Sequence, residues 1–306
     1  MKSDMSKGIL CAVCSALIFG ITPVLASITF EMGSNALTLT FYRNVMAVPV
    51  LLIILLVRKV NLRITLKELL TLTVISVLFS VTTTYILYDA YNYIGVGLST
   101  TLHFLYPMFT VLLGFLLFKK KLGREKVLAL ILATVGVAMA TGNSDVFAVK
   151  GILLALVSAV TYAGYLLGIE QTVIHEMDSM KAMFYMCIIN GITVCLFDIY
   201  SGSVVYGLEP MAMFCTFILA VANSAFAYVL LIIGIKLIGA GTASIFSMLE
   251  PVSGVIAGVV FLGEDLPLLK LASCVTILGA VMIPILKDRK DSAGKEAGSD
   301  IERLKE

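Results

Sequence analysis

Three ionisable side chains fall inside long apolar stretches and are the best candidates for chemistry: Glu250, His103 and Arg43. A titratable group inside an apolar helix costs free energy, so its presence there marks a candidate functional site. Glu250 lies directly before Pro251, which has no backbone donor and so leaves a carbonyl near residue 247 free. Glu250 could carry a coupling proton or bind a substrate amine. The structural alternative is a hydrogen bond to a neighbouring helix.

His103 and Tyr106 form a pair with a spacing of three, and Ser247 and Glu250 repeat that spacing later in the chain. Residues three apart lie on one face of a helix. Because an imidazole exchanges protons near neutrality, His103 is a second candidate for proton handling. It could equally be a neutral hydrogen-bond partner that holds two helices together.

Arg43 lies about seven residues into its apolar stretch, or roughly 10 Å deep at a rise of 1.5 Å per residue. Its guanidinium could bind a substrate carboxylate through two hydrogen bonds. It could instead reach toward the nearer membrane surface. A third possibility is an ion pair with an acidic residue expected near that surface, namely Glu31, Asp89 or Asp198.

Three further polar residues are candidates for substrate binding. Tyr162 and Tyr165 share one face of a predicted helix and could stack against a ring or a cation of the substrate. Asn223 lies within a later apolar stretch. For each of the three, packing between helices is the structural alternative.

Several other kinds of chemistry find no support. Cys11 and Cys14 form a CxxC pattern inside an apolar run with no further Cys or His nearby, so we expect apolar filler and no metal site or cofactor. With two histidines and no pair of acidic residues in one stretch, an enzyme is poorly supported. The absence of a glycine-rich phosphate loop argues against ATP-driven transport by this chain alone. A net charge of +2 gives no sign of a nucleic-acid partner.

The elements that carry these residues are predicted membrane helices. Of the 306 residues, 59% are apolar and 14% are charged, against about 25% charged in soluble domains. About 20 apolar residues span the hydrocarbon layer. Ten runs are long enough or nearly so, at residues 8–30, 36–57, 68–90, 95–118, 126–142, 150–170, 182–200, 211–236, 240–262 and 267–286. We therefore predict an all-α, multi-pass protein of the cell membrane with ten transmembrane helices.

The distribution of basic residues predicts the orientation. If ten spans alternate from a cytoplasmic N-terminus, nineteen of the 22 Lys and Arg residues lie on the cytoplasmic side and two on the other, with Arg43 inside a span. This asymmetry is what the positive-inside rule requires. Both termini are then cytoplasmic, and the polar tail 287–306 is expected to be disordered.

The two halves of the chain repeat each other. Residues 8–16, GILCAVCSA, match residues 151–159, GILLALVSA, at six of nine positions. Leu105-Tyr106-Pro107 recurs as Leu249-Glu250-Pro251, so His103 corresponds to Ser247. Five spans in each repeat would insert the halves in opposite orientations, the architecture of many secondary transporters. The four residues of the two spaced pairs are then expected to converge on one cavity.

The residues also resemble a known family. The stretch from Met248 to Leu266, with an early proline and the motif Leu262-Gly263-Glu264, resembles the end of an EamA domain of the drug/metabolite transporter superfamily. The first half keeps Pro107 but reads FKKKLGR at 118–124, and Arg43 lies where the family often has an arginine. The resemblance implies two five-helix repeats, 8–142 and 150–286, and a transporter that moves small organic metabolites, commonly outward.

We therefore expect a secondary transporter, an exporter of a small metabolite such as an amino acid, with the proton as the candidate coupling ion. Its partners would be this small-molecule substrate and the lipid bilayer. The alternatives are an uncoupled channel or facilitator and, from another class, a membrane-embedded enzyme. A channel predicts a continuous stripe of small polar residues, which no stretch displays clearly.

The topology is directly testable with reporter fusions placed after Phe118 and after Gly142. Because the predicted span 126–142 lies between them, the two fusions are expected to report opposite sides of the membrane, with the first on the cytoplasmic side. Reports from the same side would contradict the ten-span assignment.

Overall fold

The structure is a computed structural model that describes residues 2–120, 123–141, 149–262, 268–269 and 271–283. Within these residues all regular structure is helical and no strand occurs. The α-helices are α1 Lys2–Glu31, α2 Ala36–Val57, α3 Leu66–Val74, α4 Thr82–His103, α5 Tyr106–Phe118, α6 Arg124–Thr141, α7 Val149–Gln171, α8 Ser179–Ser201, α9 Pro210–Leu219, α10 Tyr228–Ile238, α11 Ala240–Ser247 and α12 Glu250–Leu262. Two π-helical segments, η1 Ile75–Val81 and η3 Ala220–Ala227, and a 3₁₀ turn, η2 Val173–His175, complete the order.

Eight helical segments of the described chain are long and apolar enough to cross a membrane. They are Asp4–Glu31, Ala36–Val57, Leu66–Ile94, Leu98–Phe118, Val149–Gln171, Ser179–Ser201, Pro210–Ile238 and Ala240–Val260. Each overlaps one of the predicted runs, which makes the chain a multi-pass helical membrane protein.

The two remaining predicted runs, 126–142 and 267–286, are shorter or more charged in the structure. α6 begins at Arg124 and so includes three charged residues in its first turn. The last apolar helix covers Leu271–Ile283, and the residues that flank it lie outside the described part, as does the predicted tail 287–306. The predicted total of ten spans therefore stays a prediction.

Two of the long segments are interrupted near their middle by a short turn. α4 ends at His103 and α5 starts at Tyr106, while α11 ends at Ser247 and α12 starts at Glu250. Pro107 and Pro251 lie at the second position of the new helix, where a missing backbone N–H costs little. The helix is thus interrupted ahead of Pro251, where we predict a free carbonyl near residue 247, and an equivalent break precedes Pro107.

The second residue of each break makes the same backbone hydrogen bond. The Leu105 N–H donates to Leu102 O at 3.1 Å, and the Leu249 N–H donates to Phe246 O, also at 3.1 Å. The π-helical segments η1 and η3 are likewise separated by nearly the same distance in sequence as the two breaks. The predicted runs 95–118 and 240–262 each contain one of these breaks, and the helix of the third predicted run, 68–90, continues beyond that run because α4 stays helical to His103.

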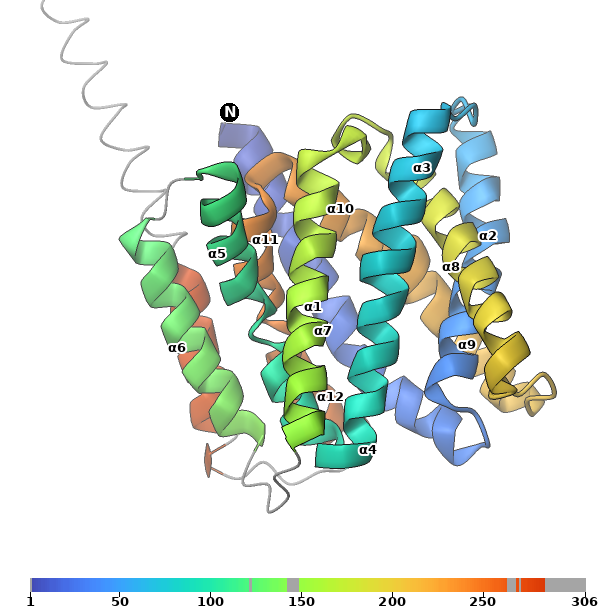
Figure 1. Ribbon diagram of the computed structural model, residues 1–306. Helices are drawn as coiled ribbons and strands as arrows, with labels where there is room; N and C mark the ends of the chain where they lie inside the picture. The colour runs from blue at the N-terminus through green and yellow to red at the C-terminus, as the bar shows by residue number, and fades with distance from the viewer. Residues whose placement is uncertain (1, 121–122, 142–148, 263–267, 270, 284–306) are drawn as a thin grey trace, which may run out of the picture.

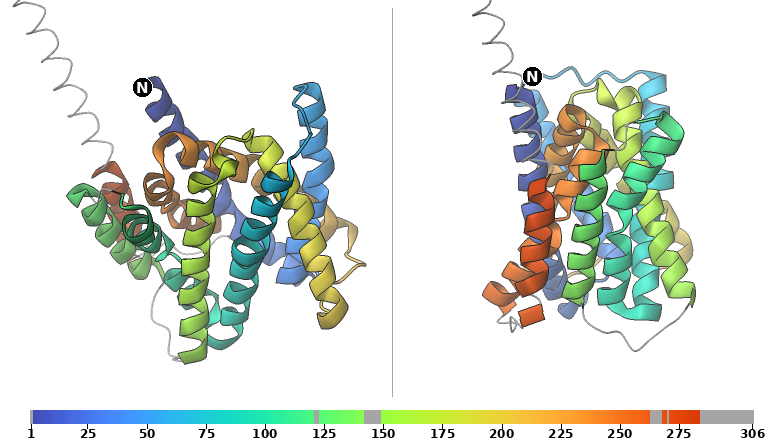
Figure 2. Two further views of the ribbon diagram at one scale, coloured as in Figure 1. Left: turned by 45° about the horizontal axis from the view of Figure 1, so that its top comes forward. Right: turned by 90° about the vertical axis from the view of Figure 1, so that its left-hand side faces the viewer.

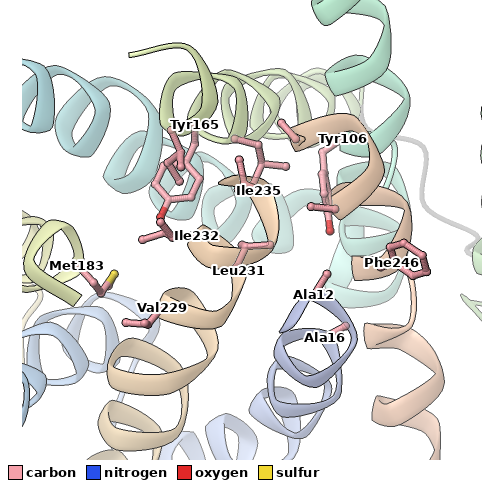
Figure 3. Close-up of a cluster of buried hydrophobic side chains, with 14 of the residues drawn as sticks. Ala12, Ala16, Tyr106, Tyr165, Met183, Val229, Leu231, Ile232, Ile235 and Phe246 are labelled. Atoms are coloured by element: carbon pink, nitrogen blue, oxygen red, sulfur yellow. The ribbon is translucent and has the colours of Figure 1, made fainter. Parts of the chain in front are cut away.

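α1 packs against α9 to α12 from the far end of the chain. Figures 1 and 2 show α1 running behind α7, with α4 beside α7 and α2 beside α8. Small residues allow the close contact of α1 with α10: a Cβ on Gly234 would lie 3.3 Å from that of Ala12. The fully buried Tyr106, Tyr165 and Phe246 belong to the same core cluster (Figure 3).

Gly20 lets α1 cross α12 at the turn that carries Glu250. A Cβ built on Gly20 would lie 1.7 Å from Ser253 Oγ and 2.5 Å from the backbone oxygen of Glu250. The Ser253 hydroxyl also donates to Glu250 O at 3.0 Å. The position of Glu250 therefore depends on the absence of a side chain at residue 20.

We expect Gly20→Ala to destabilise the protein by about 1–3 kcal/mol, because the new methyl group must displace backbone of α12. The measurement is the thermal midpoint of the purified protein in detergent. Gly279→Ala is a matched control, since a Cβ on Gly279 in the last apolar helix meets nothing within 4 Å. Equal thermal midpoints for the two variants would contradict the close crossing.

Candidate functional site

A cavity of about 540 Å³ lies between the two helix breaks. This volume is in the range of small-molecule binding sites. Its wall includes His103, Phe104 and Tyr106 from the first break and Glu250 and Pro251 from the second. The cavity extends along α1 toward Phe30 and along α4 toward Tyr91, away from the end of the bundle that carries the N-terminus.

Five of the eight predicted site residues line this cavity: Glu250, His103, Tyr106, Arg43 and Tyr162. They come from α12, α4, α5, α2 and α7, and thus from both halves of the chain. The expectation that the two spaced pairs meet at one cavity therefore holds for three of their four members.

The other three predicted residues are buried next to the cavity but do not line it. Ser247 is 3% exposed, and its hydroxyl donates to Ala243 O at 3.2 Å. Tyr165 is fully buried against Tyr162. Asn223 in η3 donates from Nδ2 to Thr22 Oγ1 at 2.8 Å, and Thr22 itself lines the cavity.

Arg43 and Glu250 bring opposite charges to the cavity wall. Among the described residues neither of the two takes part in an ion pair. The Arg43 guanidinium lies 6.0 Å from the centre of the Tyr228 ring, and its Nε atom is buried without a hydrogen-bond partner. This side chain is therefore oriented by an aromatic face and keeps capacity for a further anion.

The alternative in which Arg43 pairs with Glu31, Asp89 or Asp198 is not what the described residues adopt. Asp198 instead organises the loop after α8, where its Oδ1 accepts the Val204 N–H at 2.8 Å and its Oδ2 accepts the Tyr206 hydroxyl at 2.7 Å. Since these local donors are close in sequence, they occupy the carboxylate at little conformational cost.

Aromatic rings form a continuous wall beside the two charges. The Tyr106 and Tyr162 rings pack edge to face with their centroids 4.6 Å apart. The centroid of the His103 ring lies 5.5 Å from that of Tyr106 and 5.4 Å from that of Tyr162. The Tyr165 ring stacks behind that of Tyr162 with a centroid distance of 5.7 Å, and it packs edge to face against Tyr228 with a centroid distance of 6.3 Å. Such a wall favours a planar or apolar group of the ligand.

Sequence reasoning missed two residues at this site. Tyr228 lines the cavity and holds Arg43, but a lone tyrosine in an apolar run is usually packing. Ser158 is fully buried and bonded to His103 at 2.9 Å. Its position in the repeated GILxAxxSA pattern, where it corresponds to Ser15, was the available signal.

At the end of the bundle that carries the N-terminus, beyond the residues that line the cavity, polar contacts join α5, α6, α7 and α11. The ammonium of Lys120, just after α5, forms an ion pair with Glu170 near the end of α7. The second oxygen of Glu170 accepts the Ala240 N–H of α11 at 3.1 Å. Lys126 donates to Thr242 at 2.8 Å beside them. These contacts, which we call the Glu170 latch, join both halves of the chain.

Comparison with known proteins gives the class. Residues 6–142 and 149–286 each match the EamA-like transporter family. The chain belongs to this family, as the resemblance predicts, and it is a membrane transporter and not an enzyme.

Individual relatives agree with this assignment. "Uncharacterized transporter YcbK" of Bacillus subtilis (strain 168) is 26% identical over 67% of this chain and 68% of its own length. "Uncharacterized transporter YvbV" of the same organism is 27% identical over 74% of this chain and 76% of its own. A crystal structure with 17% identity superposes with a TM-score of 0.82 and covers 93% of this chain and 98% of its own, which shows the same fold.

The Glu170 latch yields a prediction for access to the cavity. Glu170→Gln removes the ion pair, which is worth about 1 kcal/mol at a partly buried position. We expect the labelling rate of a cysteine introduced by Thr101→Cys in the cavity to rise about fivefold when the reagent is added from the side of the N-terminus. The measurement uses an impermeant maleimide in a background that lacks the six native cysteines.

Arg58→Gln is the matched control for this prediction. Arg58 forms an ion pair with Asp178 at 3.4 Å on the same end of the bundle, away from the cavity. Labelling at residue 101 should stay at the wild-type rate in this variant. An equal rise in both variants would mean that general loosening, and not the Glu170 latch, controls access.

Proposed function

We propose that the protein is a secondary transporter that exports a small, amino-acid-like metabolite across the cytoplasmic membrane by alternating access. In this proposal ten spans form two inverted five-helix repeats, 8–142 and 150–286, with both termini in the cytoplasm. The matched helix breaks and matched π-helical segments of the two halves support the repeat. The excess of basic residues on one side supports the orientation.

The observation that carries the substrate class is the presence of Arg43 and Glu250 on one cavity wall without an ion pair to each other. An arginine fits a carboxylate, and a glutamate fits an ammonium group. A zwitterion satisfies both charges at once, whereas a simple amine or acid would leave one of them without a partner. The rings of Tyr106, Tyr162 and Tyr228 offer a surface for its side chain.

The closed end of the cavity supports alternating access over an open channel. The Glu170 latch and the core around Tyr165 separate the cavity from the proposed cytoplasmic side. The described conformation then corresponds to an outward-facing state, from which an exported substrate would leave. Uptake from the cytoplasm would require the latch to part and the opposite side to close.

Glu250 is the proposed coupling residue. It lies in the cavity, bears no ion pair among the described residues, and occupies the first position of α12 beside the break. Protonation and binding of a substrate ammonium are alternative ways to neutralise this carboxylate. Exchange of one for the other would link a proton gradient to substrate movement.

The substrate class is tested with a thermal-shift screen of the purified protein against amino acids, nucleosides, amines and organic acids. A matched set isolates the two charges: phenylalanine, phenylalaninamide, which lacks the carboxylate, and N-acetylphenylalanine, which lacks the amine. We expect the zwitterion to stabilise most and Arg43→Gln to weaken its binding about tenfold or more. Equal stabilisation by all three compounds would overturn the assignment.

The coupling role predicts a specific defect in Glu250→Gln. Because the amide keeps the shape but cannot exchange a proton, proteoliposomes with this variant should equilibrate a substrate from the screen but should not concentrate it. The measurement is substrate accumulation under an imposed pH gradient, with the thermal midpoint as the control for folding. Accumulation at the wild-type level would show that Glu250 is structural and make His103 the next candidate.

A further inference from the structure

His103 is held from behind by a short chain of hydrogen bonds in α7. Its Nδ1 atom lies 2.9 Å from the hydroxyl oxygen of Ser158. The Ser158 hydroxyl in turn donates to the backbone oxygen of Ala155 at 2.6 Å. Ser158 is fully buried, so no water competes for these contacts.

The single proton of the Ser158 hydroxyl determines the direction of both hydrogen bonds in this series. A serine hydroxyl has one proton and can donate only once. The backbone oxygen of Ala155 cannot donate, so the Ser158 proton lies between Ser158 and Ala155. The bond between His103 and Ser158 must then use the proton of the imidazole. His103 is therefore protonated at Nδ1, and in its neutral form Nε2 has a free lone pair.

We propose that Ser158 is a positioning residue that holds His103 as its Nδ1–H tautomer and presents the Nε2 lone pair to the cavity. His103 lines the cavity between Tyr106 and Tyr162, whose rings limit its rotation. The site then offers an acceptor that recognises an N–H or O–H donor of the ligand. This last step rests on the proposed function, since it adds a donor to the substrate already expected to meet Arg43 and Glu250.

The opposite tautomer would require a different hydrogen-bond pattern. With the proton on Nε2, the Nδ1 atom would be an acceptor, and Ser158 would have to donate to it. The short contact to Ala155 would then join two oxygens without a proton between them, which is unfavourable in a buried position. The cavity would also gain a donor where the present geometry provides an acceptor.

The tautomer can be measured without knowledge of the substrate. The chain has two histidines, so ¹⁵N-histidine labelling of the reconstituted protein in a His175→Gln background leaves His103 alone in the spectrum. At mildly alkaline pH we expect the Nδ1 resonance in the range of a protonated ring nitrogen and the Nε2 resonance in the range of an unprotonated one. The reverse assignment would overturn the proposal, even if transport proceeds as proposed.

Two variants separate positioning from packing. Ser158→Ala removes the acceptor, so the two nitrogen resonances should shift toward a mixture of tautomers. Ser15→Ala is the matched control, because Ser15 is the repeat counterpart of Ser158, is fully buried, and donates to Ala227 O at 2.8 Å. The His103 spectrum should not change in this control. A wild-type spectrum in Ser158→Ala would overturn the positioning role.

Exposure of Nε2 to the cavity is tested with diethyl pyrocarbonate, which acylates unprotonated imidazole nitrogens. Mass spectrometry of the wild-type protein should find His103 modified. Protection of His103 from the reagent would contradict the claim that Nε2 faces the cavity. None of these measurements depends on transport, so failure of the proposed function and failure of this inference remain distinguishable.

Discussion

The structure depends on one constraint, which is that backbone polar groups inside a membrane need partners. An unbroken helix satisfies this requirement within itself, and non-helical backbone at membrane depth is tolerated only where protein or a water-filled cavity surrounds it. This chain breaks two membrane helices, at Phe104–Leu105 and at Met248–Leu249. Both breaks border the same cavity. The close crossing of α1 and α12 at Gly20 and the core around Tyr165 keep these breaks enclosed.

The charged side chains of the cavity also need polar partners or solvent inside the membrane. Arg43 and Glu250 would be costly in lipid, and each is placed where protein and solvent can reach it. Because they come from opposite halves of the chain, a ligand that contacts both also bridges the two halves. The Glu170 latch joins those halves at the closed end. Binding between the charges and opening of the latch can therefore be coupled through the relative position of the two halves.

Much of this arrangement could be predicted from the sequence, since apolar length, charge and repetition act locally. Glu250, His103 and Arg43 were found because an ionisable residue inside an apolar run is costly wherever it lies. The complete break ahead of Pro251 and the extension of α4 were not predicted, because a proline can kink a helix without ending it. Tyr228 and Ser158 could not be assigned roles, since their partners Arg43 and His103 lie on other helices and only tertiary structure brings them together.

In the proposed transport cycle, substrate passes through one cavity whose two ends open in turn. The most direct test replaces Lys120 and Glu170 by cysteines in a background without the native cysteines and joins them with a reducible thiol cross-linker. We expect the cross-linked protein to bind a stabilising compound without transporting it, and we expect reduction of the cross-link to restore transport. Transport at an unchanged rate in the cross-linked protein would contradict the proposed cycle.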